Sequence, residues 1–90
     1  MKQYIIELVI NDPPYISIGY VSNETKDKIE LSRDEKNALV IDNQQLFNDV
    51  MRLIARWNCD PNNAYVMDWI TEVGSKKRVF RREVDKIGFE

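Results

Sequence analysis

The residues best suited to binding chemistry lie near the C-terminal end, in a short basic run. Five of the seven residues from 76 to 82 are lysine or arginine and none is acidic: Lys76, Lys77, Arg78, Val79, Phe80, Arg81 and Arg82. Basic side chains bind phosphate groups, and an aromatic ring beside them can stack on a nucleobase. The same charges also protect an edge strand from pairing with another sheet. The run therefore indicates a nucleic-acid site, a site for an anionic protein, or a charged sheet edge.

The side chains that most enzymes use are scarce. The chain has no histidine, which removes Ser-His-Asp and Cys-His catalysis and the commonest metal ligand. Its single cysteine, Cys59, cannot close an intrachain disulfide or build a CxxC metal site. The three glycines are isolated, so no glycine-rich phosphate loop is present. We therefore expect no catalytic residue, no metal site and no cofactor, in a protein that is not an enzyme.

Charge is unevenly distributed along the 90 residues, although the formal net charge is only −2. Residues 1–75 carry 7 basic and 12 acidic side chains, net −5, whereas residues 76–90 carry 6 basic and 3 acidic, net +3. A second charged stretch mixes lysine and arginine with five acidic residues, Glu24, Asp27, Glu30, Asp34 and Glu35. Mixed signs are typical of a solvated surface, with an acidic face for a basic partner as the alternative. Nine aromatic residues exceed what one small core requires, so some are expected at a partner surface.

Three strands are expected in the first third of the chain. Residues 4–10 are β-branched and aromatic with apolar side chains on both faces, which favours a central strand. Strands over 15–22 and 27–32 follow, folded about a polar loop that places Tyr20 opposite Ile29 and Ile18 opposite Leu31. Residues 32–41 fit either a short helix begun by a Ser32-x-x-Glu35 capping box or a turn before a strand at 38–41. We favour the turn and strand.

An amphipathic helix is expected from about 43 to 58, begun by Asp42 or Asn43. Asp42-x-x-Gln45 resembles a capping box. One side of this helix is apolar, with Leu46, Phe47, Val50, Leu53, Ile54 and Trp57. The other side carries Asn48, Arg52 and Arg56, and Asp49 can pair with Arg52.

The last third predicts a hairpin with Gly74 and Ser75 in a two-residue type II′ turn. One register then pairs Val73 with Lys76, Glu72 with Lys77, Ile70 with Val79, Trp69 with Phe80 and Asp68 with Arg81. Residues 76–82 form its second strand, with Lys76, Arg78 and Arg82 beside Phe80 and with Lys77 and Arg81 beside Val79. A helix over 61–74 is the competing interpretation. The tail from 84 to 90 is expected to return Ile87 and Phe89 to the core.

These elements predict one α+β domain over 1–90, a small antiparallel sheet (β-β-β-(β)-α-β-β) with one amphipathic helix packed on a face. With no signal peptide and no apolar stretch of membrane-spanning length, we expect a cytoplasmic protein without a membrane partner. The expected function is a small protein-binding module, an inhibitor, adaptor or accessory factor of the kind that phages and mobile elements encode. Its expected binding residues are Trp69, Lys76, Lys77, Arg78, Phe80, Arg81 and Arg82. The alternative is nucleic-acid binding through residues 76–82, and self-association is a third hypothesis.

Overall fold

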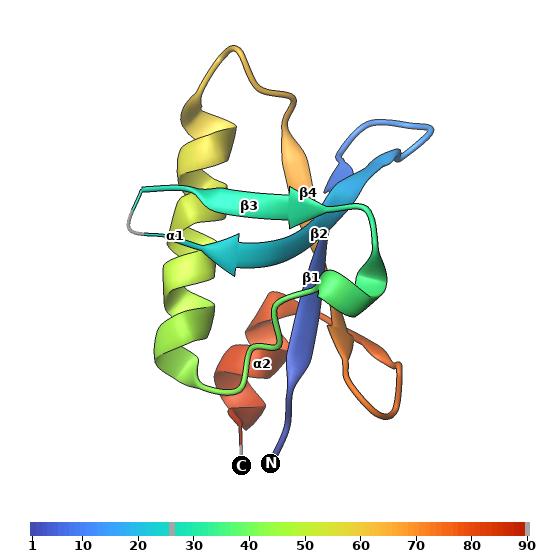
Figure 1. Cartoon of the computed structure of the whole chain (residues 1–90), viewed down its shortest axis with the longest axis vertical. Helices are drawn as coiled ribbons and strands as arrows, with labels where there is room; N and C mark the ends of the chain where they lie inside the picture. Colours follow the sequence, from blue (N-terminus) through green and yellow to red (C-terminus); the bar gives the residue numbers. More distant parts are fainter. Residues whose placement is uncertain (26, 90) are drawn as a thin grey trace.

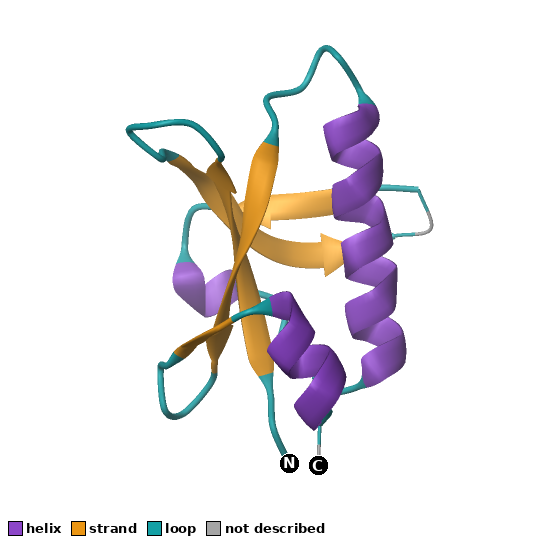
Figure 2. Cartoon of the chain, turned by 180° about the vertical axis from the view of Figure 1, so that it is seen from behind, coloured by secondary structure: helices purple, strands orange, loops and turns teal. Residues whose placement is uncertain are grey.

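The centre of the molecule is a five-stranded antiparallel sheet in the strand order β3-β2-β1-β4-β5. The computed structural model describes residues 1–25 and 27–89. Both α-helices lie on the same side of the sheet, seen from opposite directions in Figures 1 and 2. The elements are β1 (Tyr4–Ile10), β2 (Ser17–Glu24), β3 (Ile29–Ser32), the 3₁₀ helix η1 (Glu35–Asn37), α1 (Gln44–Cys59), β4 (Val66–Glu72), β5 (Arg78–Val79) and α2 (Arg81–Ile87). The expected α+β class and antiparallel sheet are confirmed, and the expectation of a single helix is wrong.

β1 is the central strand, as its apolar residues on both faces predict. It pairs with β2 along one edge and with β4 along the other. Tyr4, Ile6 and Leu8 belong to the core cluster beneath the helices. Ile5 and Val9 are also buried but lie outside that cluster, on the opposite face of the strand.

The core lies between the sheet and the two helices. α1 contributes Phe47, Val50, Met51, Leu53 and Ile54, and α2 contributes Val84. Phe89 follows α2 and packs edge-on against Tyr4, with ring centroids 5.3 Å apart, and 6.1 Å from Phe47. It thereby joins the C-terminal end to both the central strand and α1. The radius of gyration, 12.4 Å, matches the roughly 12 Å expected when 90 residues fold as one unit.

α1 is close to the helix that the sequence predicts. Its N-cap is Asn43, whose side chain accepts a hydrogen bond from the Leu46 amide at 2.8 Å. The expected Asp42–Gln45 capping box is therefore wrong, because the helix begins one residue later. The Asp49–Arg52 ion pair is present at 3.7 Å.

The predicted register between the second and third strands is wrong. Val21 lies opposite Leu31, and Glu24 lies opposite Ile29. The connection lies two residues later in the chain than expected, because β2 runs to Glu24 and β3 begins only at Ile29, with the Thr25 amide donating to the Lys28 carbonyl at 2.8 Å. Register irregularities in both the β1–β2 and β2–β3 pairs shift the partners again. Val21 and Leu31 consequently face the core, and Tyr20 faces the opposite side.

Residues 32–41 form neither a helix begun by Ser32 nor a strand over 38–41. A single 3₁₀ turn, η1, is capped instead by Asp34, whose carboxylate accepts from the Lys36 amide at 3.1 Å. The following segment makes only an isolated bridge between Ile41 and Tyr4. The Ser32 hydroxyl is used locally, as it accepts from the Asp34 amide at 3.1 Å.

The C-terminal hairpin has the predicted register, with Ile70 opposite Val79 and Thr71 opposite Arg78. The competing helix over 61–74 is wrong. The two-residue type II′ turn is also wrong, because the Glu72 amide donates to the Lys77 carbonyl at 2.8 Å and the loop between them has four residues. Widening the loop by one residue on each side leaves the pairing unchanged.

The strand expected over 76–82 contains only Arg78 and Val79, and α2 follows it. The Phe80 amide donates to the Glu83 carboxylate at 3.3 Å, and Gly88 ends the helix at a φ of 76°. Arg81 and Arg82 are thus helical residues. The predicted return of Phe89 to the core is confirmed, whereas Ile87 remains 52% exposed. None of the described helices is long and apolar enough to cross a membrane.

Candidate functional site

The sheet face away from the helices is the main surface that the core leaves open. Cross-strand pairing places Tyr20, Glu7 and Trp69 in one row over β2, β1 and β4. In the described chain, only η1 and the loops border this side (Figure 2). We call this surface the open face and define it by its half-buried and exposed residues Glu7, Tyr20, Met67, Trp69, Arg78 and Phe80, since Ile5 and Val9 on the same side of β1 are buried.

Arg78 forms the most specific contact of the open face. Its guanidinium carbon lies 3.9 Å from the ring centroid of Trp69 and 5.4 Å from that of Phe80. The β4–β5 register produces this arrangement, since Arg78 sits opposite Thr71 and therefore diagonal to Trp69. Cation–π contacts at exposed sites contribute about 0.5–1 kcal/mol each. Within residues 1–25 and 27–89, the Arg78 guanidinium has these two ring contacts and no ion pair with a carboxylate.

Arg81 forms an ion pair within the chain. Its guanidinium donates to the Asp68 carboxylate at 2.6 Å, the pair that the hairpin register predicts. The Asp68 side chain is only 15% exposed, so this ion pair is better shielded from water than an ordinary surface pair. Arg81 is therefore already bonded within the chain, at the point where β4 meets α2.

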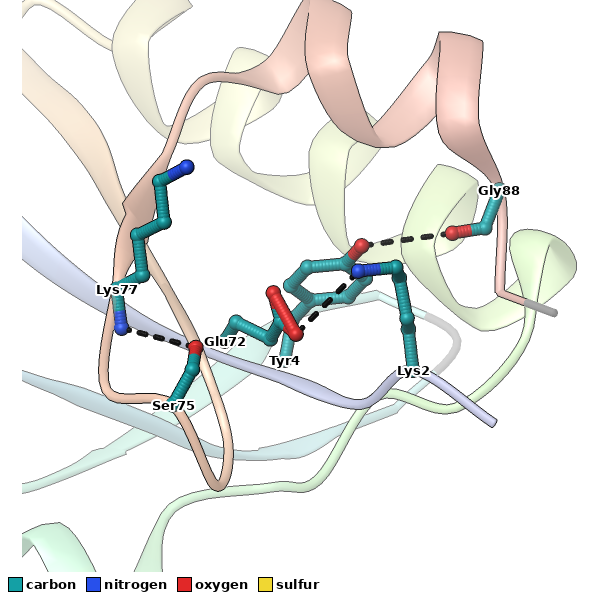
Figure 3. A network of polar contacts seen from close by, with 6 residues as sticks. All are labelled: Lys2, Tyr4, Glu72, Ser75, Lys77 and Gly88. Atoms are coloured by element: carbon teal, nitrogen blue, oxygen red, sulfur yellow. Dashed lines mark hydrogen bonds and ion pairs between the residues drawn. The ribbon is translucent and has the colours of Figure 1, made fainter.

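Lys76 and Lys77 lie apart from the arginine cluster, in the loop between β4 and β5. The expected ion pair between Lys77 and Glu72 is wrong, because Glu72 pairs with Lys2 at 3.4 Å. Figure 3 shows the Lys77 side chain extending away from Glu72, while the Lys77 amide donates to the Ser75 hydroxyl at 3.2 Å. Lys76 has a φ of 58° and lines a separate hollow beside η1.

Five of the seven expected binding residues remain close together, around the end of β5. Four of them line an open hollow of about 480 Å³ together with Met67, Asp68 and Asp85, namely Arg78, Phe80, Arg81 and Arg82. The fifth, Trp69, lies against Arg78. Phe80 is 55% exposed beside it. The sequence therefore located the cluster, although helix α2 rather than a strand carries two of its arginines.

The sequence did not predict that Glu7 and Glu35 lie near Tyr20 on the open face. Burial raises the pKa of the Tyr20 hydroxyl above its ordinary value of 10.0, and the nearby carboxylates of Glu7 and Glu35 raise it further. Tyr20 was expected on the same face as Ile29, and that register error concealed its place beside Glu7. The alternation in residues 4–10 did contain a signal, because Glu7 is the one charged residue of an otherwise apolar strand.

The described residues include no group of three or more histidine, cysteine or acidic side chains placed to hold a metal ion. Cys59 is the last residue of α1 and is exposed. Comparisons of the chain with protein-family models, curated proteins and solved structures find no match. The arrangement of the open face thus carries the functional argument without the support of a relative.

Proposed function

We propose that this protein acts by binding another protein through its open face, as an inhibitor, adaptor or accessory factor. The observation that carries the proposal is the stack of Trp69, Arg78 and Phe80 on the sheet face that lies away from α1 and α2. Tryptophan, tyrosine and arginine are the residues that most often dominate the binding energy of protein interfaces. A stack that already orders these side chains reduces the conformational entropy lost when a partner binds.

The distribution of charge over the open face also suits a protein partner. Glu7 and Glu35 lie near the Tyr20 hydroxyl, and Arg78 lies against Trp69, the cross-strand neighbour of Glu7 on β4. A surface with both signs selects a partner by complementary charges and fixes its orientation.

Nucleic-acid binding through residues 76–82 is the weaker candidate. Arg78 covers a face of the Trp69 ring, on which a base would otherwise stack. Asp68 and Asp85 line the same hollow as the arginines and repel phosphate. These two features favour a protein partner.

The proposal is tested by affinity capture from a lysate of the protein's own host. We expect wild-type protein to retain a specific partner that Arg78→Glu and Trp69→Ala both lose. Arg52→Glu is the matched control, because Arg52 is exposed on α1, on the other side of the sheet. Equal retention by all four proteins would contradict the proposal.

A titration with DNA and RNA at 50 and 200 mM salt separates the two candidates. A protein that grips phosphates binds at the lower salt and loses affinity steeply at the higher salt. We expect no binding at 50 mM. Steeply salt-dependent binding that Arg78→Glu abolishes would favour the nucleic-acid function instead.

A further inference from the structure

We infer that the hollow at the end of β5 is a binding site for a single carboxylate, supplied by a glutamate or aspartate in an apolar stretch of a partner protein. The inference rests on the proposed function and specifies the chemistry of the partner. The hollow is lined by Met67, Asp68, Arg78, Phe80, Arg81, Arg82 and Asp85.

The contacts of Arg78 leave it able to bind a carboxylate. Its guanidinium carbon lies 3.9 Å from the Trp69 ring centroid and 5.4 Å from that of Phe80, and contacts between a guanidinium and ring faces leave its in-plane N–H donors available. A carboxylate accepts two such donors side by side, which is the strongest arrangement available to an exposed arginine. Within residues 1–25 and 27–89, no carboxylate lies within 4.0 Å of the charged nitrogens of Arg78 or Arg82.

The charge of the hollow also suits a carboxylate. Three arginines and two aspartates line it, leaving a formal excess of one positive charge. Asp68 neutralises Arg81 through their 2.6 Å contact. The remaining Asp85 opposes a second negative charge, so a singly charged carboxylate matches the site better than a phosphate dianion or a polyanionic strand.

Part of the lining of the hollow is apolar. Met67 is half-buried, and the Phe80 ring is 55% exposed beside the arginines. These side chains offer contact area to apolar neighbours of the bound carboxylate, and such mixed surroundings are typical of the centre of a protein interface. A partner segment of the form apolar–acidic–apolar therefore fits the lining.

The inference is tested by NMR titration of the full chain with the blocked peptide Ac-Thr-Leu-Glu-Leu-Thr-amide. We expect saturable shifts of the Arg78 side-chain N–H and Trp69 indole N–H resonances. The matched peptide with glutamine in place of glutamate should bind about tenfold more weakly or worse, as expected for a lost charged hydrogen bond. A third peptide, with phosphoserine at that position, should bind more weakly than the glutamate peptide.

Substitutions in the protein test which residues bind the glutamate peptide. Arg78→Gln should weaken binding of the glutamate peptide about tenfold or more. Lys86→Gln should leave it within about twofold, because Lys86 is exposed on the same helix as Arg82 but does not line the hollow. Equal binding of the glutamine peptide, tighter binding of the phosphoserine peptide, or undiminished binding to Arg78→Gln would each overturn the inference.

The two tests fail in distinguishable ways. Loss of a host partner from the Arg78→Glu and Trp69→Ala proteins, without any response to the glutamate peptide, would leave the proposed function standing and remove the carboxylate site. A peptide response with no partner captured by any protein would leave the carboxylate site standing and remove the proposed function.

Discussion

At the scale of single residues, the role of each polar side chain follows from whether it already has a partner within the chain. Arg81 is bonded to Asp68, and Glu72 is bonded to Lys2. Arg78, by contrast, contacts two aromatic rings and has no ion pair within residues 1–25 and 27–89. Arg78 and Arg81 are the same residue type, and their different contacts distinguish their roles.

Asn58 is another polar side chain with partners within the chain, and its hydrogen bonds stabilise the fold. Its side chain accepts from the Val66 amide at 2.8 Å and donates to the Val66 carbonyl at 2.9 Å, as a neighbouring strand would. We predict that Asn58→Ala lowers the free energy of unfolding by about 1–3 kcal/mol, because both backbone groups lose their partner. Urea denaturation measures the change. Asn48→Ala, at an exposed position of the same helix, should stay within about 0.5 kcal/mol. Equal effects of the two substitutions would contradict this role.

Tyr4 and Tyr20 should make the protein sensitive to alkaline pH. Burial raises the pKa of both hydroxyls above 10.0; at Tyr4 the charge of Lys2 opposes this rise while Glu72 and Glu83 add to it, and at Tyr20 Glu7 and Glu35 add to it. The folded state then holds protons that the unfolded chain releases, so stability is complete below about pH 10 and falls as the pH rises above it. Tyr20→Phe should make this fall shallower in urea denaturation at pH 9, 10 and 11. A slope identical to that of the wild type would show that Tyr20 does not contribute.

At the scale of elements, the sequence predicted most where the pattern is long or self-consistent. The apolar stripe of α1 and the double-sided apolar pattern of β1 each identify one element from many residues. In the C-terminal hairpin, several cross-strand pairs agree on one register, and that register is correct although the turn type is not.

The sequence predicted least where one or two residues decide the geometry. The β2–β3 register depends on a short turn and on irregular pairing. Gly19 has a φ of 131°, and a Cβ there would lie 3.0 Å from the Ser32 carbonyl oxygen, a close approach that no periodicity reveals. α2 escaped prediction because only seven residues form it, and its charged first turn continues a run that reads as a strand. The candidate site was therefore located by charge, while its acidic neighbours depended on a register that the sequence did not determine.

α2 should depend on Phe89 for its position on the sheet. We predict that Phe89→Ala lowers the free energy of unfolding by about 3 kcal/mol or more, because the ring fills the space between Tyr4 and Phe47. Hydrogen exchange of the Lys2 amide, which donates to the Phe89 carbonyl at 3.0 Å, should also accelerate. Ile87→Ala is the control, since Ile87 is 52% exposed and should cost about 0.5 kcal/mol or less. Similar losses from both substitutions would contradict the docking role of Phe89.

At the scale of the whole molecule, the two sides of the sheet differ in what packs against them. Both helices and most of the buried apolar residues lie on one side of the sheet. The other side carries Glu7 and Glu35 near Tyr20, and Arg78 against Trp69. The net charge of −2 conceals a separation of charge along the sequence, a −5 segment followed by a +3 segment.

The most direct test of the open face as the partner surface is photocrosslinking in the native host. Phe80 is replaced by p-benzoylphenylalanine, because its ring is exposed and the substitution keeps an aromatic side chain beside Arg78. The matched position is Asn48, exposed on α1 on the far side of the sheet. We predict a discrete crosslinked protein adduct from position 80 and none from position 48. Adducts of the same protein from both positions, or from position 48 alone, would contradict the central claim.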